Sequence, residues 1–242
     1  MIDIHALFTV DGIISLITLT FLEIILGIDN IIFISIVSSK LPRNQQRKAR
    51  AWGLSLALIF RVALLFSITW IIGLKDPFFY LGSFGVTGKD IILFAGGVFL
   101  IIKTVKEIVE KINSTHYKEK DYVSLTLRSA IIQIVFLDII FSFDSILTAV
   151  GLVRNVLLMV LAVVIAMIAM LVFSEKVSDF INEHPTVKML ALAFLVMIGV
   201  VLVAEGLHFH LDKAYVYVAL IFSLTVELLN MAYRSKTHKR KT

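Results

Sequence analysis

Seven long apolar stretches run through this chain of 242 residues and limit what it can fold into. They cover about 12–37, 53–73, 88–104, 127–150, 155–173, 187–207 and 214–233. A helix needs about 20 mostly apolar residues to cross a bilayer, and lipid forces each span to satisfy its own backbone hydrogen bonds. Runs such as Val156 to Phe173 lack the alternation of a membrane β-barrel. The sequence therefore predicts an all-α membrane protein with seven transmembrane helices.

The composition supports a membrane protein and excludes several other classes. Charged residues make up 17% of the chain, against about 25% in ordinary soluble domains, and 59% of the residues are hydrophobic. Disordered chains, collagen-like repeats and water-soluble enzymes with one core do not have this composition. The chain has 0 Cys, which excludes disulfide frameworks, zinc ribbons and iron–sulfur clusters. We expect one transmembrane domain over residues 1–242.

Basic residues are concentrated after the first, third and seventh apolar stretches. The connections after the second, fourth and sixth stretches hold few, and basic loops stay on the cytoplasmic side. This bias predicts an outside N-terminus and a cytoplasmic C-terminus. The basic tail is interpreted as an anchor near anionic lipid rather than a nucleic-acid surface. The expected partner is the lipid bilayer, with no nucleic acid, and nothing in the sequence indicates the oligomeric state. The basic residues concerned are Lys40, Arg43, Arg47, Lys48, Arg50, Lys106, Lys111, Lys118, Lys120, Arg128, Arg234, Lys236, Lys239, Arg240 and Lys241.

The first and fourth stretches contain a matching segment. Residues 22–32 read LEIILGIDNII and residues 137–147 read LDIIFSFDSIL, and the two align without a gap. Each has an acid, five further residues, then Asp followed by a small polar residue. An odd number of crossings separates them, so the pattern predicts an inverted 3+3 helix repeat. Repeat one covers about 12–107, repeat two about 127–207, and the seventh helix about 214–233. Inverted repeats with polar breaks in matching helices indicate a transporter site.

The matched segments supply a candidate metal site made only of oxygen ligands. An acid at the bilayer centre costs roughly 2.5–3.5 kcal/mol, so a proton, a cation or a basic partner must offset it. Hard oxygen donors favour Mn²⁺, Mg²⁺ or Ca²⁺ over Zn²⁺ or Cu⁺. A straight helix would keep the two acids of one segment apart, so we expect local unwinding near Gly27 and Ser142. The alternative is that the acids are neutral packing groups. The candidate ligands are Glu23, Asp29, Asn30, Asp138, Asp144 and Ser145.

Five further polar residues have two possible roles each. Arg61 lies deep in the second stretch and either pairs with the acids or hydrogen-bonds backbone carbonyls. Glu205 and His208 lie near the outer end of the sixth stretch and form either an exit vestibule or an interfacial cluster. Glu227 and Asn230 lie three residues apart on one face of the seventh helix. They either support the site or pack against the bundle.

Four separated segments resemble the TerC family of bacterial membrane proteins. They are residues 23–30, 141–145, 204–210 and 226–231, in the order and at the topological positions of that family. The resemblance covers essentially the whole chain. It implies a seven-helix fold with an internal duplication and, for the Alx-like members, efflux of divalent metal, mainly Mn²⁺. The family name comes from tellurium resistance.

We therefore expect a secondary transporter that exports Mn²⁺, or otherwise Ca²⁺ or Mg²⁺, across the bacterial inner membrane. The two repeats would rock around the ion site, with H⁺ as the coupling ion. One alternative is a metal-responsive membrane scaffold or sensor in metal or tellurium stress. Another is an intramembrane aspartyl protease, although the order Gly27-Ile28-Asp29 matches Gly-x-Gly-Asp only loosely. The expectation is that the protein is not an enzyme.

Overall fold

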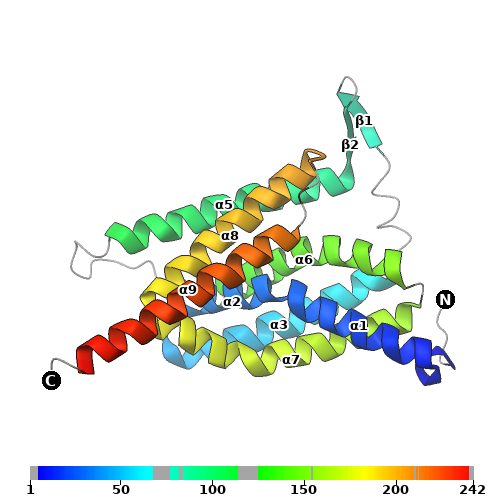
Figure 1. Cartoon of the computed structure of the whole chain (residues 1–242). Helices are drawn as coiled ribbons and strands as arrows, with labels where there is room; N and C mark the ends of the chain where they lie inside the picture. The colour runs from blue at the N-terminus through cyan, green and yellow to red at the C-terminus, as the bar shows by residue number, and fades with distance from the viewer. Residues whose placement is uncertain are drawn as a thin grey trace. The chain divides into compact units, whose positions relative to one another are not determined.

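A computed structural model describes residues 5–67, 77–81, 84–113, 125–153, 155–209, 211 and 213–239, nearly all of them helical (Figure 1). Helices occupy the described part of every predicted apolar stretch, which confirms the helical prediction; residues 68–73 of the second stretch lie outside the described residues. The elements are η1 (His5–Phe8), α1 (Val10–Leu26), α2 (Ile28–Ser39), α3 (Arg43–Phe66), β1 (Pro77–Leu81), β2 (Phe84–Thr87), α5 (Gly88–Asn113), α6 (Leu127–Leu152), α7 (Val156–Glu183), α8 (Pro185–Gly206) and α9 (Lys213–Lys239).

Five helical segments are long and apolar enough to cross a membrane by length and composition. They are Val10–Ser39, which joins α1 and α2, then Arg43–Phe66, Val156–Glu183, Pro185–Gly206 and Ala214–Arg234. The two other predicted spans correspond to α5 and α6, which are 26 residues long each. The chain is therefore a membrane protein with several spanning helices, and the count of seven spans stays a prediction.

The all-α prediction is wrong for residues 77–87. There β1 and β2 form an antiparallel hairpin in which Phe79 pairs with Val86 and Tyr80 with Gly85. Aromatic and β-branched residues favour strands, and a short connection lets two such segments pair. The hydropathy profile identified only a connection here, because a short hairpin leaves no long apolar run.

The chain forms two compact units, and the first comprises residues 1–92 and 121–180. In this unit α3 packs against α6, and α2 packs against both. Small residues recur at every fourth position of α3, at Ala49, Gly53 and Ala57, and all three are buried. A Cβ atom at Gly53 would lie 2.7 Å from the Ile134 side chain of α6. Small residues of this kind let two membrane helices approach closely.

The second unit comprises residues 93–120 and 181–242. Within it α5 and α8 meet at two glycines: a Cβ at Gly97 would lie 2.7 Å from the Gly199 carbonyl oxygen, and one at Gly199 would lie 3.1 Å from the Gly97 carbonyl oxygen. The approach is therefore reciprocal. The helix α9 packs on α8, where the rings of Phe194 and Tyr217 lie 6.3 Å apart. Most apolar side chains of α9 are exposed, as a lipid-facing helix requires.

The first predicted span is interrupted at Gly27, where α1 ends and α2 begins. The Gly27 N–H still donates to the Glu23 carbonyl, so the interruption is one residue long. A Cβ at this position would lie 2.5 Å from the Met170 sulfur of α7, so the end of that flexible side chain would have to shift to admit one. The expected unwinding near Ser142 is wrong, because α6 is continuous there. The Ser142 hydroxyl donates to Asp138 one turn earlier, which satisfies it within the helix.

Candidate functional site

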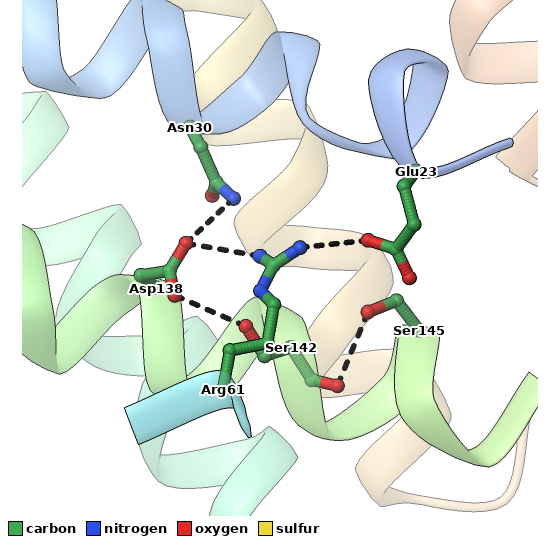
Figure 2. Close-up of polar contacts among 6 residues, drawn as sticks. All are labelled: Glu23, Asn30, Arg61, Asp138, Ser142 and Ser145. Carbon is green, nitrogen blue, oxygen red and sulfur yellow. Dashed lines mark hydrogen bonds and ion pairs between the residues drawn. The ribbon is translucent and has the colours of Figure 1, made fainter. Parts of the chain in front are cut away.

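A buried polar cluster in the first unit contains four of the six predicted ligands together with Arg61 (Figure 2). Four helices contribute to it, and both matched segments take part. Its members are Glu23 of α1, Asn30 of α2, Arg61 of α3, and Asp138, Ser142 and Ser145 of α6.

Arg61 lies at the centre of the cluster and joins two acids from different helices. Its Nη1 donates to Glu23 Oε2 at 2.7 Å, and its Nη2 donates to Asp138 Oδ1 at 2.9 Å. The three side chains are 2–3% exposed. Of the two roles open for Arg61, pairing with the acids is the one present. Glu23 and Asp138 occupy matching positions in the two aligned segments, so one guanidinium bridges these segments.

Asp138 receives two further hydrogen bonds. The Asn30 amide nitrogen donates to the same Oδ1 at 3.0 Å, and the Ser142 hydroxyl donates to Oδ2 at 3.1 Å. Ser145 donates its hydroxyl to the Ser142 carbonyl at 3.2 Å. Two buried atoms of the cluster, Asn30 Oδ1 and Arg61 Nε, have no hydrogen-bond partner among the described residues. The cluster therefore holds an unused oxygen acceptor beside the acid that Arg61 binds.

Local structure explains how these side chains meet. Glu23 lies in the last turn of α1, and Asn30 in the first turn of α2, so the interruption at Gly27 separates the two. Arg61 lies one turn after the small-residue positions that bring α3 close to α6. Asp138 and Ser142 lie four residues apart on one face of α6. Ser142 was expected only to unwind the helix. Its position four residues after Asp138 was the signal that could have identified it as a hydrogen-bond donor to that acid.

The remaining predicted ligands are Asp29 and Asp144. Asp29 is buried in the first turn of α2. Asp144 belongs to α6, but its side chain lies outside the described residues. Among the side chains that are described, no three His, Asp or Glu lie close enough to hold a metal ion. The six-residue ligand set therefore stays a prediction, of which Arg61 joins Glu23 and Asp138, and Asn30 bonds Asp138 directly.

The other predicted residues belong to the second unit. Glu205 lies in the last turn of α8, and His208 follows with a positive φ of 65°. The N–H of His208 donates to the Glu205 carbonyl, and that of Phe209 to the Ala204 carbonyl. This is a Schellman motif with His208 in the place usually taken by glycine. The backbone of His208 therefore ends α8. An exit vestibule formed by Glu205 and His208 stays a prediction.

Glu227 and Asn230 lie in α9, also in the second unit. The Glu227 side chain is half-buried and Asn230 is exposed. Their support of the ion site, or their packing against the bundle, stays a prediction.

Comparison with known proteins shows the family. The model of the integral membrane protein TerC family matches residues 8–242. The chain belongs to the TerC family. It is 46% identical over 222 residues to a UPF0053 protein of Haemophilus influenzae, covering 91% of this chain and 94% of that one. It is 48% identical over 219 residues to the UPF0053 inner membrane protein YgdQ of Escherichia coli, covering 90% and 92%.

A longer relative shares the same region. The UPF0053 inner membrane protein YoaE of Escherichia coli is 46% identical over 223 residues, which are 91% of this chain and 43% of YoaE. No solved structure matches the chain. The comparisons confirm the family that the four sequence segments indicated, and they place its relatives in an inner membrane.

Proposed function

We propose that this TerC family protein is a secondary transporter that moves Mn²⁺, or a similar hard divalent cation, outward across the bacterial inner membrane. The observation that supports this most is the charge of the buried cluster. Glu23 and Asp138 supply two carboxylates, and Arg61 supplies one positive charge. Buried charge must be balanced, so an ionised cluster of this composition attracts a further cation or a proton. Asp29 is buried in the first turn of α2, the turn that also carries Asn30.

The proposed ligands are Glu23, Asp29, Asn30, Asp138, Asp144 and Ser145. All offer oxygen, and the chain contains no thiol. Mn²⁺, Mg²⁺ and Ca²⁺ prefer such donors. The Irving–Williams order still favours Zn²⁺ at a generic site, so selection for Mn²⁺ must come from coordination geometry and is expected to be incomplete.

The proposed architecture is seven spans, with an inverted repeat and an outside N-terminus. The basic loops support this orientation. The division into compact units supports the repeat, since the first unit holds the first two helices of both repeats. The reciprocal approach of Gly97 and Gly199 joins the third helices in the way a two-fold relation would. Rocking of the repeats around the cluster would expose it to each side in turn.

The rival functions fit the cluster less well. An aspartyl protease that used Asp29 and a second aspartate to share a proton would leave the ion pairs of Arg61 with Glu23 and Asp138 without a role. An acidic excess also disfavours a tellurium oxyanion at this position. A metal-responsive sensor would use the same ligands, so only movement of the ion separates it from a transporter.

The decisive experiment is metal uptake by proteoliposomes that contain the purified protein. We expect Mn²⁺ flux above that of empty vesicles, compared with Ca²⁺, Mg²⁺ and Zn²⁺. Asp29→Asn and Asp144→Asn should each lower the flux at least 10-fold while the protein still inserts. Asp179→Asn, which neutralises an exposed acid of α7, is the matched control and should leave flux unchanged. Binding without flux would identify a sensor, peptide cleavage a protease, and normal flux in both site variants would overturn the proposed site.

A pH gradient tests the proposed coupling to protons. Protons compete with the metal for the same carboxylates, so acid on the outside should release Mn²⁺ and speed export. Flux that ignores both the size and the direction of the gradient would show a uniporter or a different coupling ion.

A further inference from the structure

The arrangement of Arg61 differs from that of a fully satisfied structural crosslink. Its two terminal nitrogens bind carboxylates of α1 and α6, yet its Nε is buried with no hydrogen-bond partner among the described residues. An orphaned buried donor costs free energy. The side chain is therefore held by its charge, through the two ion pairs, more than by complete hydrogen bonding.

Asn30 supplies a second buried polar atom of this kind. Asn30 donates its amide nitrogen to Asp138 Oδ1, and its own oxygen is buried with no hydrogen-bond partner within the described part of the chain. An amide oxygen is a ligand for hard cations. Asn30 is thus joined to one of the two carboxylates that the guanidinium binds, so Glu23, Asp138 and Asn30 are three oxygen-bearing side chains of one hydrogen-bonded cluster.

We infer that Arg61 is a tethered cation that competes with the transported metal for Glu23 and Asp138. This rests on the proposed function. A guanidinium and a divalent ion on the same two carboxylates compete, because like charges repel strongly at contact distance in a buried site. Two carboxylates and Arg61 sum to −1, and the same two with a divalent ion sum to zero. Metal entry therefore displaces Arg61, and the return of Arg61 helps to release the metal.

In this exchange Arg61 binds the two carboxylates whenever the metal is absent. Without Arg61, the metal-free cluster would carry two uncompensated buried charges, which would oppose any movement through the low-dielectric interior. With Arg61 bound, α1 and α6 stay joined when the metal is absent. The inference therefore predicts opposite effects of Arg61 on two measurable quantities. Arg61 lowers the affinity for the metal and raises the transport rate.

The test measures Mn²⁺ affinity and Mn²⁺ flux on the same variants. Protein in lipid nanodiscs is titrated with Mn²⁺ while the electron paramagnetic resonance signal of free Mn²⁺ is followed, and flux is measured in proteoliposomes. Arg61→Gln should bind Mn²⁺ at least 10-fold more tightly and transport it at least 10-fold more slowly. Arg61→Lys keeps the charge on a shorter side chain that cannot bridge both acids, so we expect a smaller tightening of several fold.

Arg50→Gln is the matched control. Arg50 is also a buried arginine of α3, about three turns before Arg61, and it bonds Ser178 at 3.4 Å and lies 3.9 Å from Glu175. Its loss removes the same charge outside the cluster and should change Mn²⁺ affinity less than two-fold. If Arg61→Gln does not fold without metal, Arg61→Lys carries the comparison.

The outcomes separate this inference from the proposed function. If wild-type vesicles do not move Mn²⁺, the proposed function fails and the inference fails with it. If the wild type moves Mn²⁺ but both Arg61 variants bind it equally or more weakly, Arg61 is a structural crosslink and only the inference fails. If Arg50→Gln tightens Mn²⁺ binding as much as Arg61→Gln does, the inference also fails, because the effect would then come from the loss of positive charge in general.

Discussion

The two bridged acids should contribute unequally to stability, although they occupy matching positions in the two aligned segments. In Asp138→Leu, which nearly preserves side-chain shape, the Arg61 Nη2 and the Asn30 amide lose their acceptor. Each stranded buried donor costs about 1–3 kcal/mol, which gives about 2–6 kcal/mol. The Ser142 hydroxyl can bond a backbone carbonyl of its own helix instead, so it adds little. Glu23→Met strands one Arg61 nitrogen, at a cost of about 1–3 kcal/mol.

The difference between the variants is therefore about 2 kcal/mol. For a chain of this length that corresponds to roughly 4–8 °C in Tm. Thermal unfolding of the purified protein in detergent, followed by near-ultraviolet circular dichroism, measures it. Ile132→Met, at an exposed position of the same helix, is the control and should shift Tm little. A Glu23→Met variant as unstable as Asp138→Leu, or less stable, would refute the reasoning from hydrogen-bond partners.

Two further predictions test packing and topology. Gly97→Ala should destabilise the protein by about 1–3 kcal/mol, as overpacking does, because the new Cβ would meet the backbone of α8; Ala95→Val, on the exposed face of α5, should not. Equal unfolding temperatures for the two variants would contradict the close helix crossing. Cysteine at Asn44 should react with a membrane-impermeant label from the cytoplasm only, and cysteine at Lys213 from the outside only. Labelling of both from one side would contradict the seven-span topology.

Much of the fold could be predicted from the sequence because lipid leaves little choice. A long apolar run must form a helix to satisfy its backbone, so each predicted stretch appears as a helix. The boundaries were less predictable: α3 begins at Arg43, before its apolar run, and α5 continues to Asn113. Polar residues extend a helix beyond the hydrocarbon, where hydropathy gives no signal. The hairpin at 77–87 was missed for a different reason, since its two short strands leave no long apolar run.

The matched segments likewise identified the acids, but not their partners. Spacing alone marked Glu23 and Asp138 as equivalent, and composition alone showed that an acid cluster in lipid needs a counter-charge. Which group supplies that charge depends on how α3 packs against α6, and Arg61 reaches both acids only in that packing. The sequence left two roles open for Arg61, because a single buried arginine can bind carboxylates or carbonyls.

The two matched helices also differ in a way that only the tertiary structure decides. The sequence pairs Gly27 with Ser142, and both were expected to unwind. The helix is interrupted at Gly27, whereas Ser142 donates its hydroxyl to Asp138 and α6 continues. Local sequence therefore determines the helices and the charges to be balanced. Contacts between segments far apart in the chain determine which cation balances the acids, because Arg61 reaches Glu23 and Asp138 across distances that no local pattern encodes.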